Sequence, residues 1–305
     1  MSDPSATATA TAHAAVPATR LERSPFERRA LTSLLLTIGV WTAAVIAGIP
    51  LISVLWMLIV RGGARLSLSL FTELPPAGFE MGGGFGNAIV GTVVMVGIAA
   101  IISIPVGVLS AVFLAELGPN SRLAQAARFA TKTLTGLPSI LAGVFAYAIV
   151  VLLTDTYSAP AGGLALAVLM LPTVVLTAEE AIRAVPRITR DAAFGMGCTR
   201  SQVVWKVLLP TATPGILTGV MLAVARAAGE TAPLLFTALF SSYWLFEGGQ
   251  PHLMQPTASL AVLIYNFAGM PFENQIELAW AASLVLVLMV LVINVTSRLI
   301  GRRRV

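Results

Sequence analysis

Long runs of apolar residues, separated by short polar segments, dominate the sequence from residue 31 almost to its end. An α-helix needs about 20 apolar residues to cross the roughly 30 Å hydrocarbon core of a bilayer. Several of the runs reach that length without a charged residue. The pattern predicts six membrane-crossing helices, over residues 31–60, 86–115, 133–154, 161–179, 214–240 and 278–296.

The composition agrees with a membrane protein. The 305 residues are 57% hydrophobic and 11% charged, whereas soluble domains average about 45–50% apolar and about 25% charged residues. One cysteine excludes an internal disulfide, and the two histidines, His13 and His252, stand in unrelated polar segments and suggest no metal site. The net charge of +5 does not indicate a nucleic-acid partner, because the basic residues lie between the apolar runs.

The distribution of lysine and arginine predicts the orientation of the helices. With the N-terminus in the cytoplasm, 16 of the 19 basic residues fall in inside segments, Arg61 and Arg65 fall outside, and Arg226 lies in a span. Positive charge collects on the cytoplasmic side of membrane proteins. We therefore expect an all-α integral membrane protein with both termini in the cytoplasm, in which an Ala/Thr-rich disordered tail, residues 1–26, precedes a six-helix domain, residues 27–305.

The longest inside segment, residues 179–210, carries helix signals. Two pairs in and beside it have the spacing of a capping box: Thr177 with Glu180, and Thr199 with Gln202. Thr189 can cap a turn that begins at Arg190, and Gly197 allows a sharp turn. We expect a short helix, a turn and a second helix, residues 201–209, that ends at Pro210.

The same segment resembles the EAA signature of ABC importer permeases, with matching spacing throughout. The matching residues are Asp191, Ala192, Ala193, Gly197, Val207, Leu209 and Pro210. The resemblance implies a six-helix fold of the type I importer (MetI-like) kind and a coupling loop that docks on a separate ATPase. The chain itself has no ATP-binding loop, because its glycine-rich stretch at 81–86 lacks the following Gly-Lys-Ser/Thr. We expect no enzyme activity and no cofactor in this chain, with ATP and Mg bound by the partner ATPase.

The fifth predicted span contains a possible ion pair. Arg226 and Glu230 are four residues apart, so on a helix they share a face. With a start near Pro214, Arg226 lies about 18 Å along the helix, where an unpaired charge costs about 2.5–3.5 kcal/mol on insertion scales. Such a residue faces a bundle interior or a water-filled path. A structural pair that ties two helices together and a role in a substrate path or its gate both remain open, and they are compatible.

The stretch from Arg226 to Leu234 is similar to one found in phosphate permeases of the PstA family. A second stretch, Gly136 to Ser139, resembles the Gly-Ile-Pro-Ser of the same subunits. The candidate substrate path or gate consists of Arg226, Glu230, Thr231, Pro138 and Ser139, because arginine donors and the backbone donors of a helix N-terminus at Pro138 and Ser139 suit an anion. Glu230 can accept a proton from phosphate or hold Arg226 between transport steps, and ordinary helix capping explains Pro138 and Ser139 equally well.

The resemblance also implies the rest of the complex. Its members are a homologous second permease, two ATPase subunits and an extracytoplasmic phosphate-binding protein, assembled in the bacterial cytoplasmic (inner) membrane. Two alternatives remain: a permease of a related oxyanion importer, for sulfate, molybdate or phosphonate, and an ion-coupled secondary transporter. The second leaves the EAA-like loop without a purpose, and a membrane-embedded enzyme is weaker still because its motifs are missing.

Overall fold

The computed structural model describes residues 28–302, so the expected disordered tail, residues 1–26, lies outside the described part. The chain divides into two units after Val54. The described part of the first unit is helix α1 (Arg28–Met57), which continues past the division. Its apolar side chains are exposed along its length, Trp41 among them. Such a helix is stable only where lipid or protein covers its apolar surface.

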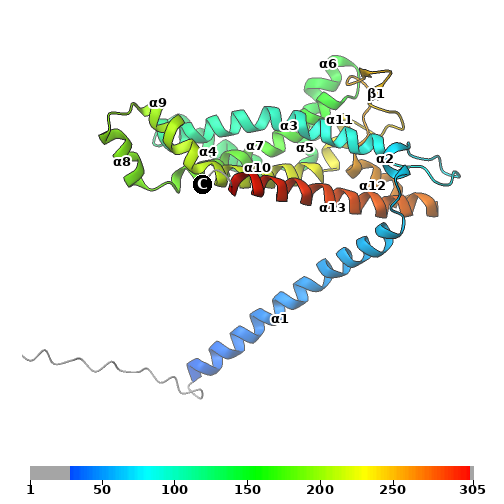
Figure 1. Ribbon diagram of the computed structural model, residues 1–305, viewed down its shortest axis with the longest axis horizontal. Helices are drawn as coiled ribbons and strands as arrows, with labels where there is room; N and C mark the ends of the chain where they lie inside the picture. The colour runs from blue at the N-terminus through cyan, green and yellow to red at the C-terminus, as the bar shows by residue number, and fades with distance from the viewer. Residues whose placement is uncertain (1–27, 303–305) are drawn as a thin grey trace, which may run out of the picture. The chain divides into compact units, whose positions relative to one another are not determined.

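The regular secondary structure of the second unit is helical apart from one small hairpin (Figure 1). Its first elements are η1 (Leu58–Gly62), α2 (Ser69–Thr72), α3 (Gly86–Val112), η2 (Phe113–Leu117), α4 (Arg122–Thr135), α5 (Ser139–Ala146), η3 (Tyr147–Val151), α6 (Leu152–Thr154) and α7 (Ala159–Arg183). Then follow α8 (Arg187–Gly195), α9 (Arg200–Gln202), η4 (Val203–Leu208), α10 (Leu209–Ala228), α11 (Ala232–Thr237), β1 (Phe246–Glu247), β2 (Gln250–Pro251), α12 (Leu260–Ala268) and α13 (Glu273–Arg302). The η segments are π-helical turns that continue a neighbouring α-helix.

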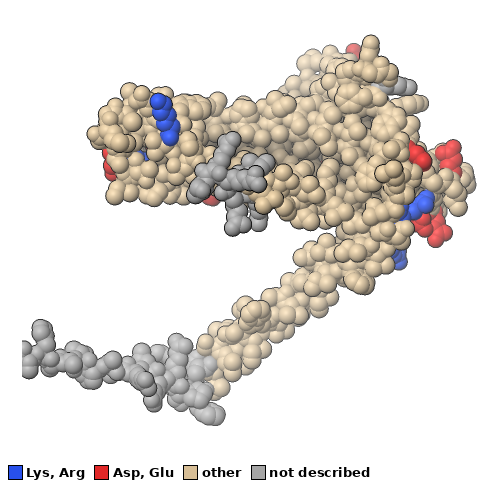
Figure 2. Space-filling view, viewed as in Figure 1, with Lys and Arg blue, Asp and Glu red and all other residues tan. Residues whose placement is uncertain are grey.

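Among the described residues, five helices are long and apolar enough to cross a membrane. They are Leu31–Gly62, Gly86–Leu117, Ala159–Arg183, Arg200–Ala228 and Glu273–Ser297. A sixth span results if the bent pair Arg122–Thr135 and Ser139–Thr154 is counted as one. On the face of the second unit drawn in Figure 2, charged side chains lie toward the two ends and the visible surface between them is uncharged. The prediction of a multi-pass membrane protein is confirmed.

Close packing of α3 against α7 forms the centre of the second unit. Met95 and Ala99 of α3 are fully buried with Leu166, Met170 and Val174 of α7. Small residues bring the two backbones together, as they commonly do in membrane helix pairs. A Cβ atom on Gly107 would lie 2.6 Å from Cγ1 of Val174, so a larger residue there must displace the Val174 side chain.

The third span begins later than the apolar pattern predicts. Residues 133–154 are not one helix, because α4 ends at Thr135 and α5 begins at Ser139, with a bend of 107° between the two halves. Pro138 causes the break, since proline disfavours a helical conformation at the residue before it. Helix α4 is amphipathic and its Arg128 binds Glu179 near the end of α7, so the apolar run includes the end of a different element.

The fifth span also differs from residues 214–240. Its helix begins at Arg200, runs through η4 and α10, and ends at Ala228 before the short helix α11. The predicted helix end at Pro210 is wrong. A proline in a helix lacks an N–H and clashes with the carbonyl four residues earlier, but the wider π-helical turns of η4 directly before it relieve that clash.

The outer segment between the fifth and sixth spans, residues 241–277, is not a plain loop. It contains α12, in which Leu260 and Leu263 are fully buried against α13 and α3. The hydroxyl of Thr92 on α3 accepts a hydrogen bond from the Leu260 amide at 2.9 Å. The nine-residue helix is too short to cross a bilayer, which is why a search for spans passes over it.

Two of the predicted helix caps are wrong. Thr177 lies inside α7, where its hydroxyl donates to the carbonyl of Thr173 at 2.7 Å. Thr189 lies inside α8, which begins at Arg187 after Pro186. Proline is well tolerated at a helix N-terminus because its fixed φ suits the first turn and no hydrogen bond is lost there.

Candidate functional site

The segment between α7 and α10 contains the helix, turn and second helix that the sequence predicts, although the second helix continues past Pro210 into α10. Gly197 has φ +82°, a left-handed conformation that glycine adopts at low cost. Thr199 then caps α9: its hydroxyl accepts from the Gln202 amide at 3.4 Å, and the Gln202 side chain accepts from the Thr199 amide at 2.8 Å. The capping box predicted here is confirmed.

Helix α8 has an anchored face and a free face. Ala193 is only 2% exposed and packs in a cluster with Val203, Val204 and Leu208 of η4. The exposed residues of α8 and of the turn after it include the motif residues Asp191 and Ala192 and the apolar residues Ile188, Phe194 and Met196. Apolar side chains gathered on an exposed surface commonly mark a protein interface.

The remaining residues of the EAA-like motif hold the segment together. Val207 and Leu209 are half-buried against the cluster that contains Ala193, and Pro210 is exposed. The structure therefore brings the motif residues into one folded body. Asp191 and Ala192 lie on its surface, and Ala193, Val207 and Leu209 contribute to its packing.

Several ion pairs at this end of the molecule were not expected from the sequence. Glu179, buried near the end of α7, accepts from Arg128 of α4 at 2.9 Å and pairs with Arg183 at 2.8 Å. Arg190 of α8 pairs with Glu116 of η2. The partners of Arg128 and Arg190 lie far away in the sequence, so no local spacing reveals these pairs. The only available signal is that Glu116 and Glu179 end apolar runs.

Arg226 and Glu230 form the expected pair, although in a different local structure. Helix α10 ends at Ala228, and Glu230 lies in the break before α11. The Arg226 Nε and Glu230 Oε1 atoms are 3.3 Å apart, with the arginine side chain 48% exposed and the glutamate side chain 17% exposed. An exposed arginine in a membrane-crossing segment must face protein or a water-filled path, because lipid does not solvate it.

The two stretches singled out in the sequence, residues 136–139 and 226–234, lie in elements that touch. A Cβ atom on Gly143 of α5 would be only 2.6 Å from the Pro233 Cα atom of α11. Ser139 lies one turn before Gly143 and therefore on the same side of α5. Pro138 precedes the first turn of α5, and Thr231 precedes the first turn of α11. The break that carries Glu230 is thus next to the α5–α11 contact.

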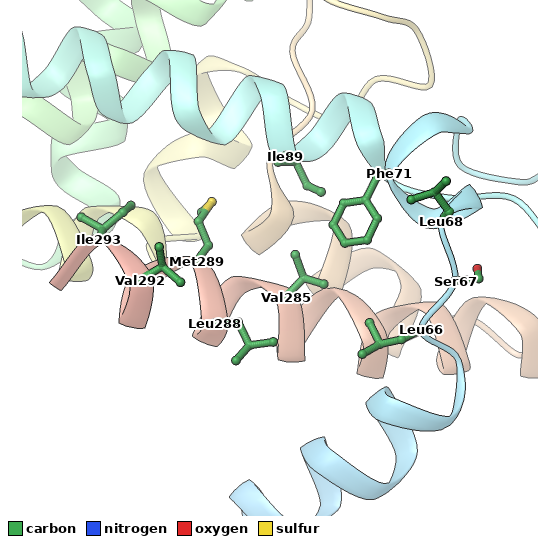
Figure 3. Close-up of a pocket in the computed structure, with 10 residues that line it drawn as sticks. All are labelled: Leu66, Ser67, Leu68, Phe71, Ile89, Val285, Leu288, Met289, Val292 and Ile293. Atoms are coloured by element: carbon green, nitrogen blue, oxygen red, sulfur yellow. The ribbon is translucent and has the colours of Figure 1, made fainter. Parts of the chain in front are cut away.

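An apolar groove between α3, α13 and residues 66–71 has a volume of about 660 Å³ (Figure 3). Nine of its ten lining residues are apolar, and the tenth is Ser67. A phosphate ion would find no charged donor there, so this groove is not an anion site. Within residues 28–302, no group of three or more His, Cys, Asp or Glu side chains is placed to hold a metal ion.

Comparison with known proteins gives the same assignment as the motifs. Residues 103–305 match the family described as binding-protein-dependent transport system inner membrane component. The phosphate transport system permease protein PstA of Yersinia pestis is 40% identical over 254 residues, which cover 83% of this chain and 84% of that protein.

Solved structures support the fold. The MetNI methionine ABC transporter, in inward-facing conformations, aligns with a TM-score of 0.57 at 22% identity, over 72% of this chain and 93% of the matched chain. A bacterial alginate ABC transporter, solved with its alginate-bound periplasmic protein, aligns with a TM-score of 0.63 at 14% identity, over 92% and 98% of the two chains. At these identities the likeness concerns the fold alone.

Proposed function

We propose that this chain, which belongs to the PstA family of binding-protein-dependent transport permeases, forms one transmembrane half of an ATP-driven phosphate importer. The family assignment supplies the class of transporter and the cargo. The structure supplies the groups that would perform the two tasks of such a subunit, which are contact with the cargo and coupling to an ATPase.

The exposed Arg226–Glu230 pair is the observation that carries the proposal. Arginine offers a planar set of N–H donors that matches the oxygens of phosphate. Because Arg226 is half exposed on this subunit, a second permease packed against it would complete a shared path around the pair. Thr231 directly precedes α11, and Pro138 and Ser139 begin α5, the helix that packs on α11, so we place all three along that path. Glu230 either takes a proton from phosphate or holds Arg226 when the path is empty.

The exposed surface of α8 is the proposed contact with the ATPase. Asp191 and Ala192 are exposed on α8, and Ile188, Phe194 and Met196 add exposed apolar side chains that a partner would cover. ATP and Mg would be bound by that partner, whose hydrolysis cycle moves α8. This chain would then act as the moving channel wall and perform no chemistry on ATP.

The proposed complex contains a homologous second permease, two ATPase subunits and an extracytoplasmic phosphate-binding protein, in the cytoplasmic (inner) membrane of a bacterium. The outer segments of the second unit would receive the binding protein. Exposed apolar residues at this end, such as Phe79 and Met81, provide contact surface.

Replacement of Arg226 by alanine tests the proposal. We expect phosphate uptake by the complex in liposomes to fall at least about tenfold, because a hydrogen bond to a charged group contributes about 1.5–3 kcal/mol. The ATPase should still co-purify. Arg122→Ala is the matched control, since Arg122 is exposed on α4, away from the pair. Unchanged uptake by the Arg226 variant would remove this residue from the transport path.

The same liposomes separate the alternative functions. Uptake of sulfate, molybdate or phosphonate in place of phosphate would indicate a related oxyanion importer. Uptake by this chain alone, driven by an ion gradient and without ATPase, would indicate a secondary transporter. Phosphate uptake that requires both ATP and the binding protein supports the proposal.

A further inference from the structure

Arg190, the residue directly before the motif residue Asp191, is held against the body of the protein. Its side chain is 19% exposed, and Nη2 donates to the carbonyl of Ile182 at the end of α7 at 2.8 Å. Its Nη1 atom pairs with Glu116. Arg187, the first residue of α8, and Arg200, the first residue of α9, are exposed. Arg190 is therefore placed to connect α8 to the helices above it.

Glu116 lies in η2, the π-helical turn at the inner end of α3, and is also 19% exposed. The same turn is bound from a second direction. Arg128 of α4 donates to the carbonyls of Leu114 at 2.7 Å and Pro119 at 2.8 Å, while its Nε atom binds Glu179. Side chains from α4 and α8 thus converge on the short connection between α3 and α4.

This connection leads to the proposed path. Helix α4 continues into α5 through the 107° bend at residues 136–138, and α5 packs on α11 through Gly143 and Pro233. The break that carries Glu230 directly precedes α11. A displacement of η2 and α4 would therefore reach the elements around the Arg226–Glu230 pair by packed contacts alone.

We infer that the Arg190–Glu116 pair is a permanent tie that passes movement of α8 to the α3–α4 connection, so that coupling fails when the pair is lost. The inference rests on the proposed function. Arg190 is a positioning residue: it contacts neither phosphate nor ATP and acts through Glu116. Because both side chains are mostly buried, removal of one leaves the other charge without its partner, and α8 loses its connection to η2.

The test measures phosphate moved per ATP hydrolysed by the complex in liposomes. Glu116→Gln and Arg190→Gln should each lower this ratio about two- to thirtyfold, the range found for changes along a coupling route. The double variant should be no worse than either single variant, because one tie can be lost only once. Arg122→Gln, which changes an exposed arginine of α4, should keep the parental ratio. Multiplying losses in the double variant would contradict a shared tie.

A covalent link tests whether the tie is permanent. In a Cys198→Ser background, Glu116→Cys and Arg190→Cys remove the ion pair, and a short bis-methanethiosulfonate reagent joins the two thiols. We expect the link to restore phosphate transport per ATP, and a reducing agent to abolish the gain. A linked complex that hydrolyses ATP without transport would show that the pair must open, which overturns the inference.

The outcomes separate this inference from the proposed function. If the single variants no longer hold the ATPase during purification, Arg190→Lys replaces them, since lysine keeps the charge but lacks the fork that reaches both Glu116 and Ile182. If the variants move as much phosphate per ATP as the parent, the inferred tie is wrong, while the proposed importer function still stands. A parent complex that moves no phosphate with ATP and binding protein present would overturn the proposed function, and this inference with it.

Discussion

Gly143 shows how a single residue sets the distance between two functional elements. An added Cβ would come within 3 Å of two main-chain atoms of Pro233, which cannot rotate away. Gly143→Ala should therefore push α5 from α11 and lower stability by about 1–3 kcal/mol, the usual cost of overpacking. A lower melting temperature in detergent and reduced phosphate uptake would show it. Gly97→Ala in α3, where nothing lies within 4 Å, should lower neither, since alanine is the better helix former.

Gly197 is required for its backbone conformation and not for lack of space. No atom lies within 4 Å of a Cβ placed there, yet φ is +82°. Gly197→Ala should therefore cost about 1–2 kcal/mol through the left-handed backbone alone. Faster proteolysis of the segment between α8 and α9 measures the effect. Gly195→Ala, inside α8 and equally open, should slow proteolysis or leave it unchanged, and equal effects of both would refute the backbone explanation.

At this scale the sequence predicts what is local. The turn at Gly197, the Thr199–Gln202 capping box and the Arg226–Glu230 pair all join residues within four positions, and all three are present. The Arg190–Glu116 and Arg128–Glu179 pairs join residues that only the packed helices bring together. Sequence reasoning finds the charges but has no means to match them.

Two adjacent alanines of helix α8 have different roles, one in packing and one in contact with the proposed partner. Ala193 is buried against η4, whereas Ala192 is exposed. Ala193→Asp places a charge in an apolar cluster and should disrupt the segment, at a cost of several kcal/mol. Ala192→Asp should leave the fold intact and weaken only the binding of the ATPase. Limited proteolysis and co-purification separate the two effects, and loss of the fold in the Ala192 variant would contradict the assigned faces.

Elements were predicted well where apolar length decides and poorly where it does not. The long apolar runs mark the spans, because a bilayer requires them. The errors concern prolines and short helices. Pro138 breaks a helix inside one apolar run, while Pro210 is accommodated in a continuous helix after the π-helical turns of η4. Helix α12 is buried by packing against α13 and α3, which hydropathy does not report.

For the whole molecule, function depends on which end of the second unit faces the cytoplasm. The α8 and α9 segment lies at one end of this unit and α2 and α12 lie at the other (Figure 1). The bias of lysine and arginine assigns the α8 end to the inside. An ATPase can reach α8 only with this orientation, and a binding protein can reach residues 76–82 only with the same one. Both proposed contacts therefore depend on one property.

Cysteine labelling in intact cells tests that orientation. Met81 and Met196 are 88% and 78% exposed at opposite ends of the second unit, so Met81→Cys and Met196→Cys form a matched pair in a Cys198→Ser background. A membrane-impermeant maleimide should label position 81 from outside and position 196 only after permeabilisation, because a charged reagent does not cross the hydrocarbon core. Labelling of position 196 from outside would place α8 beyond the reach of any cytoplasmic ATPase. The transporter would then need another source of energy, and the Arg190–Glu116 pair would have no ATPase-driven movement of α8 to transmit.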